Sequence, residues 1–247
     1  MAWGGCRGYK YEVTGGQKGR AVPPGLPARL SEAPHYPRPI ERSADSWVHI
    51  IGLTAGILGG LTLLGLALGF GHLRTAAAVG VYALCLILMF FCSAAYNLAS
   101  ARRRPLLRRF DHAAIFLMIA GSYTPFTTLR LTGAWAIGMT VAVWSLALAA
   151  AAGKLFAPGL GKGFWVGLYL ALGWIAVVAI KPLLARVSIA ALILLLAGGV
   201  VYSTGVIIYL RRQLPFRRAI WHGFVVAAAA THYAAILTGV VLASPLH

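Results

Sequence analysis

The chain has 247 residues, of which 60% are hydrophobic and 11% are charged, and its formal net charge is +17. A soluble domain carries about 25% charged residues. This composition therefore excludes a soluble globular protein and predicts helices that cross a bilayer, because only helices and closed barrels satisfy their backbone hydrogen bonds in lipid. The three cysteines show the spacing of neither a disulfide framework nor a zinc knuckle.

Residues 1–46 differ in composition from the rest of the chain. They are rich in glycine, proline and charged residues and contain no apolar run of the kind found in a signal peptide. Such a segment cannot bury enough apolar surface to become ordered. We therefore expect two parts, a polar and disordered cytoplasmic tail over 1–46 and a transmembrane domain over 47–247.

Seven apolar segments follow the tail, and each is long enough to cross a hydrocarbon core of about 30 Å as a helix. The connections between them are short, which favours an all-α integral membrane fold with a single bundle of seven transmembrane helices. In chain order the predicted segments are 47–71, 75–100, 110–129, 133–153, 163–180, 187–210 and 219–246.

Basic residues are distributed unevenly along the chain. Of the 22 lysines and arginines, 18 lie in the tail or in the connections after the second, fourth and sixth segments, and four lie in the other connections. Cytoplasmic loops carry an excess of these residues, so we predict a cytoplasmic N-terminus and an external C-terminus. The pattern argues against nucleic acid as a partner, predicts membrane lipids as partners and fits a bacterial inner membrane.

Asp111 is the only acidic residue in the last 202 positions. A carboxylate inside a membrane needs a partner, a metal or a proton, so the residues that reach it form the candidate site. The predicted topology brings the cytoplasmic ends of the second, third and seventh segments to one level. Ser93 and Asn97 share a helical face, as do Arg218 and His222, because each pair is four residues apart.

Several stretches of the chain resemble one known family in their order and spacing. They are ERSADSWVHIIG before and into the first segment, SAAYN closing the second, RFDHAAIFLMIAGSYTPF in the third, GLYLALGW in the fifth, AGGVVYSTGVIIYL in the sixth and RRAIWHGFVVAAAATHYAAI in the seventh. Through these motifs the chain is similar to the hemolysin III branch of the progestin and adipoQ receptor superfamily.

The resemblance implies a zinc ion near the cytoplasmic helix ends, held by three histidines with an aspartate beside them. Ser93, Asp111 and His222 match residues of the family motifs, but Asn97 and Arg218 stand where the motifs have the other two histidines. Arginine stays protonated and cannot bind a metal, and an amide oxygen is a weak zinc ligand. We therefore predict a degenerate metal site in which Arg218 neutralises Asp111 and the other three side chains supply hydrogen bonds.

Other interpretations of these residues stay open. In one, a zinc site is retained by His222 and Asp111, with His49 or His112 as a further ligand. In another, the side chain of Arg218 extends to the lipid headgroups. His49 can also be a hydrogen-bonded residue of the core.

The resemblance implies a lipid-binding or receptor-like protein of membrane homeostasis, with no cofactor at the degenerate site. The alternative is a zinc-dependent membrane hydrolase of the ceramidase type, with zinc as cofactor and Asp111 as the catalytic carboxylate. The replacement of two ligand histidines, at Asn97 and Arg218, argues against an enzyme, because a metal-bound water would not be activated there.

Overall fold

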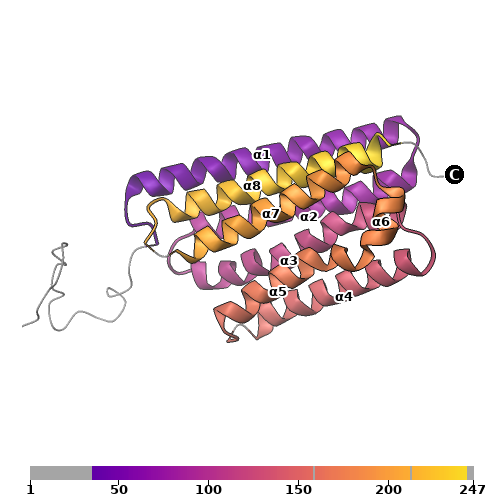
Figure 1. Ribbon diagram of the computed structural model, residues 1–247. Coiled ribbons are helices and arrows are strands. Elements are labelled where there is room, and N and C mark those ends of the chain that lie inside the picture. Colours follow the sequence, from indigo (N-terminus) through magenta and orange to yellow (C-terminus); the bar gives the residue numbers. More distant parts are fainter. Residues whose placement is uncertain (1–34, 158, 212, 244–247) are drawn as a thin grey trace, which may run out of the picture. The chain divides into compact units, whose positions relative to one another are not determined.

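The computed structural model describes residues 35–157, 159–211 and 213–243, and the regular elements in these ranges are all helical. Residues from Arg38 onward form one compact unit, in which the helices lie side by side (Figure 1). The elements are α1 (Pro39–Gly69), α2 (Leu73–Leu98), α3 (Arg104–Leu129), α4 (Gly133–Phe156), α5 (Lys162–Trp174), the 3₁₀ helix η2 (Ile175–Ala179), α6 (Ile180–Arg186), α7 (Ile189–Leu210), α8 (Arg217–Ile236) and the π-helical turn η3 (Leu237–Val241).

The first helix begins earlier than the sequence indicated. Arg38 has an extended backbone and Pro39 lies in the first turn of α1, where the missing N–H of proline costs no hydrogen bond. Residues 39–46, which the composition assigns to a disordered tail, are therefore helical, and Asp45 is buried within α1. Residues 1–34 of the predicted tail lie outside the described residues.

Six helical segments of the described chain are long and apolar enough to cross a membrane. The predicted third segment, 110–129, lies in α3, and α3 is not among these six candidate spans. The first eight residues of α3 include three arginines and Asp111. The structure thus supports a helical membrane protein, whereas the count of seven spans stays a prediction.

The predicted fifth segment, 163–180, is divided in the structure. It comprises α5, η2 and the start of α6, and together these elements form one candidate span, Lys162–Arg186. The interruption has a local cause, because the Tyr123 hydroxyl of α3 donates to the carbonyl of Gly173 at 2.7 Å and accepts from the amide of Ala176 at 3.1 Å. A side chain inserted between backbone partners breaks the regular ladder of an α-helix.

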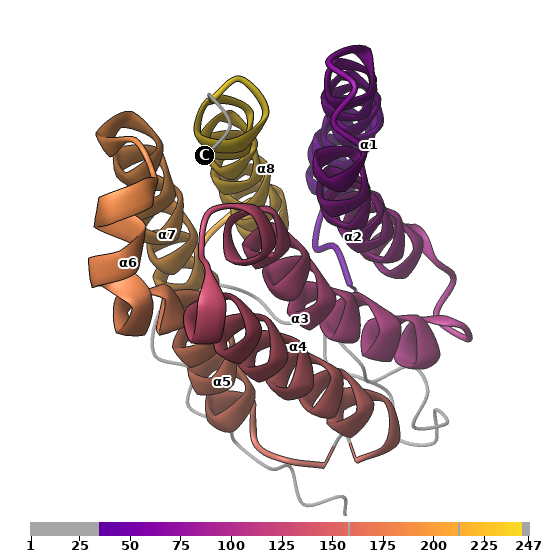
Figure 2. The same cartoon turned by 90° about the vertical axis from the view of Figure 1, so that its right-hand side faces the viewer.

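α3 lies near the centre of the bundle, where it has more neighbouring helices than any other described helix. It packs against α2, α4, α5 and α8, and Figure 2 shows it between α2 and α4. α1 lies against α2 and α8, and α8 also packs on α7. The end of α2, the start of α3 and the start of α8 therefore meet at one end of the bundle.

Glycines let α2 approach both of its neighbours closely. A Cβ atom added at Gly121 of α3 would lie 2.7 Å from the Cβ of Cys85, and one added at Gly60 of α1 would lie 2.9 Å from the Cβ of Ala83. Small residues at such crossings allow two backbones to pack in contact. The close spacing of α1, α2 and α3 brings their polar side chains within reach of one another.

Candidate functional site

Asp45 of α1 is a fully buried carboxylate that orients two imidazole rings. Its Oδ1 accepts a hydrogen bond from Nδ1 of His222 on α8 at 2.6 Å, and its backbone carbonyl accepts one from Nδ1 of His49, one turn further along α1, at 2.7 Å. Carboxylate and carbonyl oxygens only accept hydrogen bonds, so both rings carry a proton on Nδ1. Each ring therefore has its Nε2 atom left for a partner other than Asp45.

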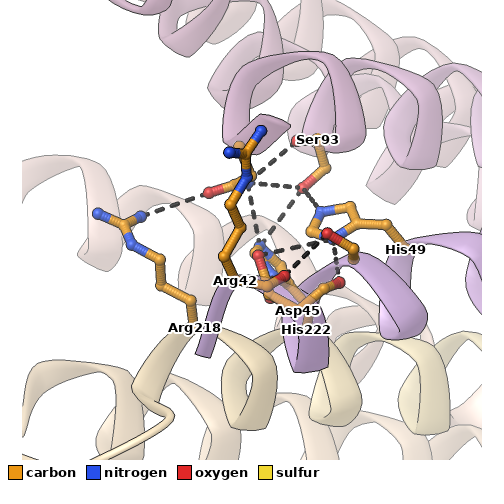
Figure 3. A network of polar contacts seen from close by, with 8 residues as sticks. Arg42, Asp45, His49, Ser93, Arg218 and His222 are labelled. Atoms are coloured by element: carbon orange, nitrogen blue, oxygen red, sulfur yellow. Dashed lines mark hydrogen bonds and ion pairs between the residues drawn. The ribbon is translucent and has the colours of Figure 1, made fainter. Parts of the chain in front are cut away.

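Both Nε2 atoms face Ser93 of α2. The Ser93 hydroxyl lies 3.2 Å from Nε2 of His49 and 3.4 Å from Nε2 of His222. Asn97, one turn along α2, donates to the Ser93 carbonyl at 3.0 Å and lies 3.5 Å from Nε2 of His222. Nη1 of Arg218 donates to Oδ1 of Asn97 at 3.4 Å. This polar network joins α1, α2 and α8 (Figure 3).

Asp111 of α3 is buried beside a polar cavity of about 510 Å³. Its Oδ2 lies 3.9 Å from Nε2 of the adjacent His112. The structure brings all five residues predicted from the sequence to the wall of this cavity, namely Ser93, Asn97, Asp111, Arg218 and His222. The direct neutralisation of Asp111 by Arg218 stays a prediction.

Sequence reasoning missed Asp45. Its position before the apolar run placed it in the tail, and its partner His222 is 177 residues away in the chain. The available signal was the spacing of four residues between Asp45 and His49, which puts both on one face of a helix. His49 itself is buried and hydrogen-bonded at both ring nitrogens, as one of the interpretations of the sequence requires.

Asp45, His49 and His222 also form a group that could hold a metal ion, because one ligand atom of each lies within 4.8 Å of the others. Two imidazoles and a carboxylate are ligand types that zinc accepts. Nδ1 of His222 is hydrogen-bonded to Oδ1 of Asp45 at 2.6 Å, so that ring would meet a metal ion through Nε2, with Asp45 fixing its orientation. The donor set therefore suits zinc.

An apolar cavity of about 430 Å³ adjoins the polar one. The two cavities, together called the joined cavities below, are adjacent, and five residues line both: Met89, Ile115, Tyr169, Tyr202 and Val225. Ligand-binding cavities commonly have volumes of roughly 300–1,000 Å³ and mostly apolar walls with a few polar groups. The joined cavities therefore offer an apolar compartment and a polar compartment to one amphiphilic molecule.

Comparisons with known proteins identify the family. The family model described as Haemolysin-III related matches residues 40–233. The chain is 32% identical to the Hemolysin-3 homolog of Bacillus subtilis (strain 168) over 198 residues, covering 80% of this chain and 93% of that protein. It is 33% identical to Hemolysin-3 of Bacillus cereus over 198 residues, covering 80% of this chain and 90% of that protein.

A mammalian protein extends the relationship. The chain is 28% identical to the human monocyte to macrophage differentiation factor over 212 residues, covering 82% of this chain and 85% of that protein. The matches confirm the resemblance drawn from the sequence motifs, both to hemolysin III and to the wider superfamily. The chain therefore belongs to the haemolysin-III related family of helical integral membrane proteins.

Proposed function

We propose that this protein binds a membrane lipid in the joined cavities and acts as a receptor-like protein of membrane homeostasis. The observation that carries the proposal is the adjacency of the apolar cavity and the polar one, which have five lining residues in common. An acyl chain would occupy the apolar compartment, and the headgroup would lie against the polar side chains. A few polar groups in a mostly apolar site fix the orientation of a ligand.

In this proposal the polar network takes the place of a metal centre. Arg218, hydrogen-bonded to Asn97 at 3.4 Å, puts a fixed positive charge where the family resemblance implies a zinc-binding histidine. A fixed cation repels a metal dication, and the repulsion is stronger at low dielectric. A lipid that contacts the network better in one arrangement of α1, α2 and α8 would shift the protein toward that arrangement.

We also propose seven spans in a bacterial inner membrane, with a cytoplasmic N-terminus and an external C-terminus. α3 lies between α2 and α4, which are both apolar and long enough to cross a membrane. Short connections join α3 to α2 before it and to α4 after it. If α2 and α4 run in the same direction across the membrane, α3 must cross in the opposite direction to join them. The uneven distribution of basic residues supports the orientation.

Native mass spectrometry of the full-length chain, purified in an uncharged detergent, tests the lipid-binding proposal. We expect a lipid to co-purify with the protein. Ala229→Phe fills part of the apolar cavity that Ala229 lines and should remove the lipid. Ala230→Phe is the matched control, because Ala230 is exposed on the same helix and lines neither cavity. Equal lipid retention by the two variants would contradict the proposal.

A second candidate function is hydrolysis of a lipid ester or amide without a metal. Asp45, His222 and Ser93 stand in the order carboxylate, imidazole and hydroxyl, with contacts of 2.6 Å and 3.4 Å, which is the order of a serine-hydrolase triad. Ser93 would attack the carbonyl carbon and pass its proton to His222, which would return it to the leaving group; water would then release the acyl group. The 3.4 Å contact between the Ser93 hydroxyl and Nε2 of His222 is longer than the roughly 2.6–3.2 Å expected for an activated nucleophile. Lipid binding is therefore the first candidate function.

A fluorophosphonate probe separates these functions. A triad predicts covalent labelling at Ser93, which Ser93→Ala and His222→Phe would each abolish. A binding protein predicts no labelling in any of the three proteins. Zinc-dependent hydrolysis, the alternative that the sequence leaves open, predicts lipid cleavage that a chelator removes and added zinc restores, without labelling of Ser93.

A further inference from the structure

A second polar cluster lines the polar cavity on α3, α4 and α5. Lys154, in the last turn of α4, is only 9% exposed, and its Nζ lies 4.3 Å from the ring centroid of Trp165 on α5. Within the described part of the chain, Lys154 forms no ion pair and no hydrogen bond. An ammonium group that is shielded from most water and has no acceptor is unfavourable, and its contact with an aromatic face compensates for only part of that penalty.

Further cations surround the same region. Arg108 and Arg109 of α3 and Lys162 of α5 also line the cavity. Arg109 donates to the α4 backbone one residue beyond Lys154 at 3.2 Å, which holds the two helices together there. The charges of Lys154, Arg108 and Lys162 all act electrostatically on His112. All three side chains thus line the cavity around His112.

The described lining of the cavity contains too few acidic groups to balance these charges. With Arg218, five basic side chains line it, against the single carboxylate of Asp111. Arg108, Arg109 and Lys162 are exposed, whereas Lys154 is buried beside them, and like charges act more strongly on a group that is shielded from water. An anion from outside the chain would relieve this repulsion, and the oxygens of a phosphate group can accept hydrogen bonds from several lysines and arginines at once.

We propose that Lys154, Arg108 and Lys162 form a subsite for the phosphate group of an anionic lipid. The inference rests on the proposed lipid-binding function and narrows it to amphiphiles with a phosphate headgroup, whose acyl chain would lie in the apolar cavity. Tyr169 and Tyr202 line both cavities and lie where the two compartments meet. The subsite is distinct from the network of α1, α2 and α8, because its residues lie on α3, α4 and α5.

Three probes test the subsite on the full-length chain in an uncharged detergent. Oleoyl lysophosphatidic acid carries both phosphate and acyl chain, monooleoylglycerol carries the chain alone, and glycerol 3-phosphate carries the phosphate alone. Dissociation constants are measured by microscale thermophoresis. Lys154→Met should weaken binding of lysophosphatidic acid about tenfold or more, as expected for a lost charged hydrogen bond, and should leave monooleoylglycerol unchanged.

Other variants guard against a folding defect in Lys154→Met. Lys162→Gln changes an exposed residue and should also weaken the binding of lysophosphatidic acid, but by a smaller factor than Lys154→Met does. Lys154→Arg keeps the charge and should retain binding. Lys181→Gln is the matched control, since Lys181 lies on α6 and lines neither cavity, and it should alter no dissociation constant.

The outcomes separate the subsite from the lipid-binding function. The subsite is overturned if Lys154→Met weakens the binding of both chain-bearing probes equally. It is also overturned if neither Lys154→Met nor Lys162→Gln weakens the binding of lysophosphatidic acid. If glycerol 3-phosphate binds in a Lys154-dependent manner and monooleoylglycerol does not bind, the phosphate subsite stands and the lipid-binding function fails. If both chain-bearing probes bind equally and Ala229→Phe weakens both, lipid binding stands and the phosphate subsite fails.

Discussion

At the scale of single residues, Asp45 organises the polar end of the bundle. Its carboxylate accepts from His222 and its backbone carbonyl accepts from His49, so one residue fixes the orientation of two rings on two helices. Both rings then direct Nε2 toward Ser93. The position of Asp45 at 0% exposure means that water cannot replace these contacts.

We predict that Asp45→Ala lowers the free energy of unfolding by about 1–3 kcal/mol, because the buried Nδ1–H of His222 loses its acceptor. Thermal unfolding in detergent measures the change. His222→Phe should lower the free energy of unfolding less in the Asp45→Ala background than in the native protein, because the hydrogen bond between Asp45 and His222 is already absent there. Glu41→Ala on the same helix is the control and should cost less than about 1 kcal/mol, because Arg38, its ion-pair partner at 2.9 Å, is 54% exposed and water screens the pair.

Two residues decide whether the network can hold a metal. We predict that the native protein purifies with well below one zinc per chain and that the double variant Asn97→His, Arg218→His binds about one. Asn97 lies 3.5 Å from Nε2 of His222 and Arg218 lies 3.4 Å from Asn97, so new imidazoles would converge near that nitrogen with the three-histidine set that zinc accepts. Elemental analysis of both proteins side by side measures this. One zinc per native chain would refute the degenerate site.

At the scale of elements, close helix contacts fix the positions of the site residues. Gly121 lets α3 approach Cys85 of α2, and these are the two helices that carry Asp111 and Ser93. The 3₁₀ interruption of the fifth span arises in the same way, from a side chain of α3 that enters the backbone of its neighbour. The geometry of the cavity therefore depends on contacts between helices as much as on the helices themselves.

We predict that Gly121→Ala destabilises the protein by about 1–3 kcal/mol, because the added methyl group would overlap Cys85 in a packed interface. Gly138→Ala in the interior of α4 is the matched control, since a Cβ there meets no atom within 4 Å. The control should be neutral or stabilising by up to about 1 kcal/mol, as expected from helix propensity. Equal melting temperatures for the two variants would mean that α2 and α3 can separate without cost.

The sequence predicts elements better than contacts between elements. The segment 187–210 differs from α7 by two residues at its start, because an apolar run between polar ends marks a membrane helix directly. The interruption after Trp174 could not be predicted, since it depends on the Tyr123 hydroxyl of another helix. Asp45 was missed for the same reason, whereas Asp111 was found because a lone carboxylate in an apolar run is visible in the sequence.

At the scale of the whole molecule, the charge distribution predicts the orientation in the membrane. Four of the basic residues that line the polar cavity, Arg108, Arg109, Lys154 and Lys162, lie in connections or helix ends on the side that we propose to be cytoplasmic. The same charges that orient the chain thus also contribute to the proposed phosphate subsite. An anionic lipid of the cytoplasmic leaflet would reach the cavity from this side.

We predict that reporter fusions at residue 40, within 102–109 and within 211–217 read as cytoplasmic, and that a fusion after residue 246 reads as external. The expectation follows from the excess of lysine and arginine in the tail and in the connections after the second, fourth and sixth segments. Paired phosphatase and fluorescent-protein fusions measure both sides of the membrane. A cytoplasmic C-terminus would refute the orientation and remove α3 as a seventh span.

The low apolar content of α3 has a consequence for how the protein is made. Among the helices of the described residues that are long enough to span, only α3 does not meet the composition of a membrane span, and it packs against α2, α4, α5 and α8. A nascent α3 would leave the insertion machinery with its arginines and Asp111 facing lipid, which is unfavourable. If α3 is a seventh span, its stable entry into the bilayer would therefore await the helices that follow it, and we expect these helices to insert jointly.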